Sequence, residues 1–325
     1  SQTSDALARI LRKGSISFSG AKDIRDSLLR LKVGSSLSIA ELLRVSALLR
    51  VALRASDYGK RDHEPGEEDD ALDAMFRELA PVISLAKEID RCILSEEEIA
   101  DDASNGLRSV RRAMKTAAEK IRTQLNSLVV NSRTYLQDGV ITMRNGRYCV
   151  PVKAEHKSNV PGMVHDQSSS GSTIFVEPLS VVKLNNELRE LEIREQKEIE
   201  AVLAALSNQT CDHLDELTLD LELIGELDFI FAKAALSRHY RGCEPRLNKD
   251  GIIRLKNARH PLLDPHRVVP ITLTLGENFD LLIVTGPNTG GKTVSLKTVG
   301  LLTLMGLAGL HVPAAEGTTL SVFTE

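Results

Sequence analysis

The chain has very few aromatic residues and cysteines. Among its 325 residues there is no tryptophan, and aromatic residues make up only 3%. The apolar fraction of 42% therefore comes mainly from leucine, isoleucine, valine and alanine, which suits cores formed between helices. The four cysteines, Cys92, Cys149, Cys211 and Cys243, lie far apart and form no Cys-x-x-Cys pair. This spacing argues against zinc and a disulfide framework, and is typical of a reducing cytosol.

Long apolar runs are also missing. The longest apolar helical stretch, around Leu301 to Leu310, is too short to span a bilayer, and we expect no signal peptide. The predicted location is the cytoplasm, with no membrane contact. The formal net charge is −4, from 41 basic and 45 acidic residues. Because the whole chain is not basic, any contact with nucleic acid must come from a local basic face.

A stretch from Leu281 to Thr293, LLIVTGPNTGGKT, predicts a phosphate-binding loop. Leu281 to Val284 is a short apolar run that predicts a buried parallel strand, and Val294 to Leu310 predicts a helix. Between them lies a complete G-x-x-x-x-G-K-[ST] motif. The predicted nucleotide-binding residues of this motif are Gly286, Pro287, Asn288, Thr289, Gly290, Gly291, Lys292 and Thr293.

The chemistry of this loop points to ATP and Mg²⁺. Glycines let backbone N–H groups face phosphate oxygens, and the following helix adds its positive end. Lys292 is predicted to reach the β- and γ-phosphates, and Thr293 to ligate Mg²⁺. An ATPase of this type also needs an acidic residue at the end of a later strand. After Lys292 the chain has only Glu316 and Glu325, neither following an apolar strand, so we expect no catalytic residue here and little or no turnover.

Two long helices dominate the middle of the chain. From Ser104 to about Arg133, apolar residues recur at alternating three- and four-residue steps, which predicts a coiled-coil seam. Its members are Leu107, Val110, Met114, Ala117, Ile121, Leu125 and Leu128. The outward face carries Arg108, Arg111, Arg112, Lys115, Lys120 and Arg122. These bases indicate a solvated helix face, with nucleic-acid contact as the alternative.

A small β structure is predicted between the two long helices. Val140–Arg144 and Arg147–Lys153 read as strands joined by Asn145-Gly146, the strongest short hairpin signal. Val160–His165 and Thr173–Val176 are two further strand candidates. Pro178 then opens a helix to about Leu206, so the two helices should pair antiparallel with the sheet at their far end. The mildly basic tip could touch a phosphate backbone through Arg144, Arg147, Lys153 and Lys157.

The predicted fold is a multidomain α plus α/β protein. A helical core and a long coiled-coil stalk with a small β clamp tip precede the N-terminal part of a P-loop ATPase domain. Helices are expected near the N-terminus, with Ser38 and Glu41 as a capping box, and again over Ala71–Ala86. The predicted segments are a connector over 1–103, a first stalk helix over 104–137, a tip over 138–177, a second stalk helix and helical return over 178–246, and a truncated ATPase segment over 247–325.

Three stretches together resemble the MutS family, and most closely its bacterial second paralogue, MutS-two. They are GRYCVPVKAEHKSNVPGMVHDQSSSGSTIFVEP (146–178), LNNELRELEIREQKEI (184–199) and ARHPLL (258–263), which precedes the glycine-rich loop. The resemblance covers nearly the whole chain and keeps the family's order. It implies a homodimeric, DNA-binding ATPase that closes around duplex or branched DNA. It also implies suppression of homologous recombination and, in the full-length protein, a C-terminal nuclease domain.

The same resemblance assigns a further role near the loop. Val268 or Val269 falls where the family places an apolar residue against the adenine base of ATP; the alternative is an ordinary strand residue. A second function also remains open, an ATP-switched coiled-coil protein that binds ribosomal RNA and acts in rescue of stalled ribosomes. A basic, open tip would favour nucleic acid, whereas an apolar tip patch would favour docking to protein.

Overall fold

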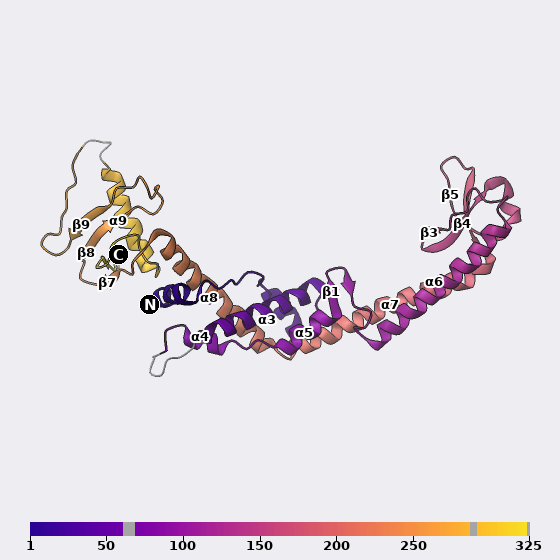
Figure 1. Cartoon of the computed structure of the whole chain (residues 1–325), viewed down its shortest axis with the longest axis horizontal. Coiled ribbons are helices and arrows are strands. Elements are labelled where there is room, and N and C mark those ends of the chain that lie inside the picture. The colour runs from indigo at the N-terminus through magenta and orange to yellow at the C-terminus, as the bar shows by residue number, and fades with distance from the viewer. Residues whose placement is uncertain (61–68, 287–290, 324–325) are drawn as a thin grey trace. The chain divides into compact units, whose positions relative to one another are not determined.

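A computed structural model describes residues 1–60, 69–286 and 291–323 (Figure 1). The chain forms two compact units. The first comprises Ser1–Arg25, Ala47–Ile83 and His213–Glu325, and the second comprises Asp26–Ser46 and Ser84–Asp212. The nucleotide-loop motif therefore belongs to the first unit, and both predicted stalk helices belong to the second.

Helices pack around an aromatic cluster in the first unit. Helix α1 (Gln2–Lys13) lies against α8 (Leu214–Tyr240), with α4 (Asp73–Glu78) and the end of α3 (Ile39–Gly59) nearby. Four of the chain's few aromatic rings, Phe18, Tyr58, Phe76 and Phe231, meet here at centroid distances of 5.7–6.1 Å. Such edge-to-face and tilted contacts add about 0.5–1.5 kcal/mol per pair beyond area burial. Four of the eleven aromatic residues of the chain thus contribute to this one cluster.

A mixed four-stranded sheet completes the first unit. Its strands are β7 (Arg246–Asn248), β8 (Ile253–Ala258), β9 (Ile271–Leu275) and β10 (Thr319–Ser321), in the spatial order β7-β10-β8-β9. Strand β10 runs parallel to β7 and antiparallel to β8. Helix α9 (Lys292–Leu307) packs on this sheet through Leu302, which is buried with Leu255 and Leu320. The sheet therefore holds the helix that follows the glycine motif.

The predicted buried strand at Leu281–Val284 is wrong. These four residues form no strand, and their side chains are 43–75% exposed. A strand requires a neighbouring strand to pair its backbone N–H and C=O groups, and no described strand pairs with this segment. Four apolar residues in a row predict burial, but the pairing partner has to come from elsewhere in the fold.

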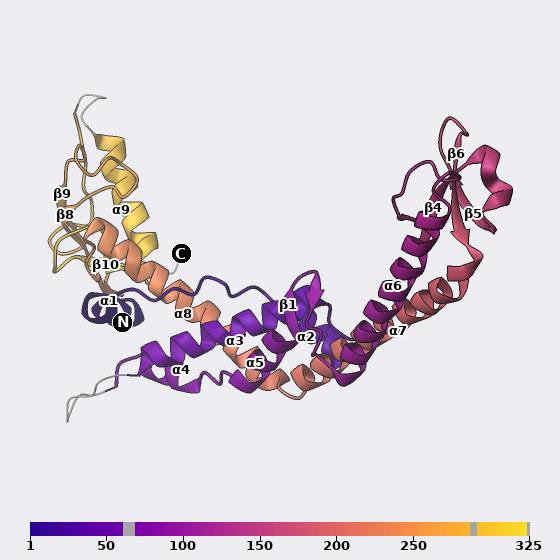
Figure 2. The same ribbon diagram turned by 45° about the vertical axis from the view of Figure 1, so that its right-hand side comes forward.

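The long helix pair of the second unit is confirmed. Helix α6 (Asn105–Asn131) begins at an N-cap where Leu107 N–H donates to the Ser104 hydroxyl, and α7 (Leu179–Cys211) follows Pro178. All seven predicted seam residues of α6 are buried or partly buried. Arg111 pairs with Glu195, and the backbone of Gly106 lies against Glu198. Residue numbers therefore increase along α6 while the numbers of the contacting residues on α7 decrease. The pair is therefore antiparallel; Figures 1 and 2 both show the two helices side by side.

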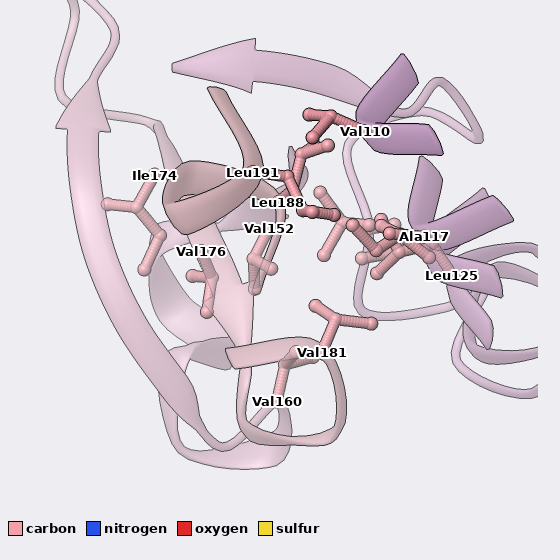
Figure 3. Packing of buried hydrophobic residues seen from close by; sticks show 13 residues of the cluster. Val110, Ala117, Leu125, Val152, Val160, Ile174, Val176, Val181, Leu188 and Leu191 are labelled. Atoms are coloured by element: carbon pink, nitrogen blue, oxygen red, sulfur yellow. The ribbon is translucent and has the colours of Figure 1, made fainter. Parts of the chain in front are cut away.

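A four-stranded antiparallel sheet forms the tip, as predicted. Its strands are β3 (Thr142–Arg144), β4 (Arg147–Lys153), β5 (Gly162–Gln167) and β6 (Thr173–Pro178), in the order β3-β4-β6-β5, with a short 3₁₀ segment over Ala154–Asn159. Asn145 and Gly146 both have positive φ, 51° and 74°, as a two-residue type I′ turn requires. Figure 3 shows Val152, Ile174 and Val176 facing stalk residues such as Val181 and Leu188. Tip and stalk thus share one apolar core.

Shorter elements complete the second unit, and one of the helix predictions needs correction. They are α2 (Arg25–Lys32), α5 (Ile83–Cys92), β1 (Ile93–Ser95) and β2 (Glu98–Ile99). The single helix predicted over Ala71–Ala86 is in fact two, α4 and α5. The break falls beside Pro81, which cannot donate a backbone hydrogen bond and disfavours helical geometry in the residue before it.

Candidate functional site

The glycine motif spans the entry to α9. Gly286 has φ 140° and Gly291 has φ 77°, conformations in which a Cβ atom is strained, so glycine is needed at both positions. Gly291 is the N-cap, and Lys292 and Thr293 are the first two residues of the helix. Pro287, Asn288, Thr289 and Gly290 lie outside the described residues. The described ends of the motif have the backbone geometry of a loop that runs into a helix.

The side chain of Lys292 reaches back across the motif. Its Nζ donates to the carbonyl oxygen of Gly286 at 2.5 Å, so the ammonium group closes the loop from its own helix. The first backbone N–H groups of a helix such as α9 have no partner within the helix, and its N-terminus carries a partial positive charge of about 0.5. Fixed positive charge and the helix end are therefore placed together, which is the arrangement that binds phosphate.

The other predicted nucleotide residues are in the same unit. Thr293 is exposed on the first turn of α9. Val268 and Val269 lie between β8 and β9; Val268 N–H donates to the Asp264 carbonyl oxygen at 2.8 Å, and Val269 is 78% exposed. The described residues contain no group of three or more His, Cys, Asp or Glu side chains able to hold a metal ion.

Two of the four predicted basic residues of the tip are held by internal contacts. Arg147 Nη1 pairs with Glu177 Oε1 at 2.7 Å, and its Nη2 donates to Asn186 Oδ1. Arg144 lies over the Phe175 ring at 4.0 Å from the centroid, and its Nε is 3.1 Å from Asp166 Oδ2. Both guanidinium groups thus stabilise the tip itself.

The two lysines of the tip differ from the arginines. Lys153 donates to the Thr134 carbonyl oxygen at 3.2 Å, an interaction that leaves its charge without a carboxylate partner. Lys157 is exposed, and its side chain makes no hydrogen bond or ion pair within the described residues. The structure therefore places three of the four basic residues on β3 and β4 and Lys157 in the adjoining 3₁₀ segment, and it leaves mainly the lysines available to an external phosphate.

Glu177 organises the tip, a role that the sequence did not reveal. Its fully buried carboxylate accepts from Arg147, from His165 Nε2 at 2.6 Å and from Asn185 Nδ2 at 2.8 Å. Burial opposes ionisation, but the bonds from Asn185, His165 and Arg147 outweigh it and hold the pKa of Glu177 below its ordinary value. The partners come from β4, β5 and α7, so a sequence pattern of short range could not join them.

A second polar cluster links α9 to the helices of the first unit. His311 is buried; its Nδ1 is 2.8 Å from Ser237 Oγ on α8, and its Nε2 is 2.9 Å from Ser4 Oγ on α1. Thr3 Oγ1 donates to the Gly309 carbonyl oxygen at 2.8 Å. Burial lowers the pKa of His311, which favours its neutral form. The C-terminal end of the loop-bearing helix is thus fixed to α1 and α8.

Comparison with curated proteins gives one consistent family. The chain is 54% identical over its whole length to "Endonuclease MutS2" of Lachnoclostridium phytofermentans, of which it covers 42%. It is 55% identical over 99% of its length to the protein of that name from Agathobacter rectalis, covering 41% of it. The protein of the same name from Acetivibrio thermocellus is 46% identical over 99% of the chain, which covers 41% of it. No protein-family profile matches the chain.

These relatives define the class of the protein: the chain belongs to the MutS2 family, as the resemblance in the sequence predicted. The antiparallel helix pair with a sheet at its tip, and the glycine motif at the start of a helix, are features that the sequence also predicted. It spans about two fifths of the length of the curated relatives that it matches. No helix among the described residues is both long enough and apolar enough to cross a membrane.

Proposed function

We propose that this chain is the nucleotide-responsive, DNA-binding part of a MutS2 protein. The observation that carries the proposal is the motif at the start of α9, where Lys292 closes a glycine loop at a helix N-terminus. Membership in a family whose relatives are named endonucleases adds that the substrate of the whole protein is nucleic acid. The ligand of the loop is ATP with Mg²⁺.

Each described group of the loop has a distinct task in holding that ligand. The unpaired N–H groups of the first turn of α9 donate to phosphate oxygens, and Lys292 exchanges its bond to Gly286 for the β- and γ-phosphates. The Thr293 hydroxyl contributes one oxygen ligand to Mg²⁺, which when bound neutralises phosphate charge. Val268 or Val269 packs against the base. The chain itself supplies binding and orientation.

The second unit is the DNA-binding part in this proposal, and the protein acts as a homodimer that encloses duplex or branched DNA. In this proposal, suppression of recombination and nuclease activity are functions of the full-length protein. The names of the relatives contain nothing on ribosomes, so the ribosome-associated alternative has no support from them.

Titration with a fluorescent ATP analogue tests the nucleotide site directly. In the presence of Mg²⁺, Lys292→Ala should weaken binding at least tenfold, because a charge-assisted contact to phosphate contributes about 1.5–3 kcal/mol. Lys297→Ala is the matched control, since Lys297 is exposed one and a half turns further along α9 and should leave the affinity unchanged. Equal affinities for the unsubstituted chain and Lys292→Ala would contradict the proposal.

A further inference from the structure

One face of α6 carries a straight row of basic side chains. Arg108, Arg112, Lys115 and Arg122 recur at helical spacing and are all exposed, with Glu119 the only acidic residue on the row. The row lies opposite the buried seam that contains Ala117 and Ile121, so it faces away from α7. At about 1.5 Å per residue, Arg108 to Arg122 extends over about 21 Å. We call these four residues the α6 basic row.

Most of the α6 basic row is not neutralised within the chain. Among the described residues, the ion pairs of α6 involve only Arg108, with Asp102 at 3.6 Å, and Arg111, with Asp101 and Glu195. Arg111, which the sequence had placed on the outward face, is therefore turned inward. The side chains of Arg112, Lys115 and Arg122 make no hydrogen bond or ion pair in the described parts of the chain.

This arrangement costs the helix stability. Like charges three or four residues apart destabilise an isolated helix by about 0.2–0.5 kcal/mol per pair, and Arg108, Arg112 and Lys115 form two such neighbouring pairs. A solvated helix face on which acidic residues alternate with basic ones would need no further explanation. The charges of α6 do not alternate in this way, because the helix has six basic residues and only one acidic residue.

The partner helix shows the contrast. On α7 an equivalent exposed row reads Lys183, Glu187, Glu190, Arg194 and Lys197. Acidic residues interrupt this row, and over its length α7 has more acidic than basic residues. The excess of positive charge on the stalk is therefore confined to α6, and a polyanion would be attracted to one side of the stalk only.

We propose that the α6 basic row binds the phosphate backbone of duplex DNA along the shaft of the stalk. The inference rests on the proposed DNA-binding function and names the surface that performs it. A rigid, straight row of charges fits a stiff polyanion that carries one phosphate per about 3.4 Å of axis on each strand. The side chains contact phosphates alone, so binding is independent of sequence. The shaft then adds a contact surface to that of the tip, where Arg144 and Arg147 are paired internally.

The experiment replaces the three unpartnered bases together, as Arg112→Gln, Lys115→Gln and Arg122→Gln. Binding of the 325-residue chain to a labelled duplex of random sequence is measured by fluorescence anisotropy over a range of salt concentrations. The triple variant should bind about tenfold more weakly, and the slope of log affinity against log salt should fall by up to about 3. Its thermal stability should be unchanged or higher, because repulsion along α6 is removed.

A matched variant controls for net charge. Lys183→Gln, Arg194→Gln and Lys197→Gln remove the same charge from exposed positions on α7, and should leave the salt slope near that of the unsubstituted chain. Equal losses in both triple variants, or none in either, would overturn the α6 assignment while duplex binding itself stands. Failure of the unsubstituted chain to bind any duplex would overturn the proposed function as well. Tighter α6-dependent binding to a ribosomal RNA helix would overturn the assignment to DNA.

Discussion

Asp220 is a buried acid, and one of its two carboxylate oxygens has no hydrogen-bond partner within the described residues. That oxygen is Oδ2, whereas Oδ1 accepts from the Ala80 N–H at 2.8 Å. Burial raises the pKa of this carboxyl to about 6, and the charge of nearby Glu216 adds to the effect. Because the folded chain holds this proton more tightly than the unfolded chain, the contribution of Asp220 to stability is most favourable below about pH 4. It declines as the pH rises to about 6.

Asp220→Asn should therefore stabilise the first unit at pH 8 by about 1–3 kcal/mol, because the amide keeps the shape of the side chain without a buried charge. The gain should shrink at pH 4.5. Urea unfolding at both pH values measures it, with Asp215→Asn as the control at an exposed position on the same helix. A destabilised Asp220→Asn at pH 8 would show that the carboxylate is required in its charged form.

Glu177 should behave in the opposite way. Its pKa is lowered in the folded chain, so its stabilising effect is present above the ordinary pKa of a glutamate and is lost as the pH falls through the lower folded value. Glu177→Gln should cost the tip about 1.5–3 kcal/mol at pH 7, since Gln cannot accept three charge-assisted bonds. Thermal unfolding tests this against Glu190→Gln on the exposed side of α7. Equal stability of the two variants would remove Glu177 from its organising role.

At the scale of elements, the stalk depends on its apolar seam. Ile121 is fully buried between α6 and α7, so Ile121→Ala should cost about 2–5 kcal/mol of unfolding free energy. Val130→Ala on the same helix, where the side chain is 75% exposed, should change it by less than about 0.5 kcal/mol. Limited proteolysis combined with urea unfolding gives the measurement. Comparable effects of the two changes would mean that the helices do not depend on this seam.

The elements also show how far local patterns reach. The seam of α6, the Asn145-Gly146 turn and the Ser38–Glu41 capping box were all predicted, and each appears with its expected contacts or dihedral angles. Each depends on spacings of four residues or fewer along the chain. The run Leu281–Val284 has an equally clear pattern, yet it is exposed and unpaired. A helix satisfies its own hydrogen bonds, whereas a strand depends on another segment.

For the whole molecule, the prediction concerns coupling between nucleotide and DNA. The chain passes between its two units after Arg25, Ser46, Ile83 and Asp212, and α9 is tied to α1 and α8 through His311. A shift of α9 on binding ATP should reach the second unit through these segments. By linkage, DNA must then change the affinity for ATP by the same factor by which ATP changes the affinity for DNA. The corresponding coupling free energy is typically about 1–3 kcal/mol.

Nucleotide affinity with and without saturating duplex measures this coupling, in full-length protein shown to bind both ligands. Ser237→Ala removes one of the two side-chain contacts of the His311 ring and should reduce the coupling while leaving nucleotide binding in place. Identical ATP affinities in the two conditions would contradict the coupling and leave the stalk as a spacer.

The sequence by itself determined the helices of the stalk, the four strands of its tip, the family, and the position of the glycine motif. All of these follow from the short-range spacing of residue types or from a contiguous string of residues. Only the tertiary structure decided which charges are free. It turned Arg111 toward Glu195, placed Arg147 and His165 on the buried Glu177, and left Arg112, Lys115 and Arg122 exposed on one side of α6. Such pairings join residues up to 84 positions apart, and they follow from how the chain returns on itself, which periodicity along one segment does not encode.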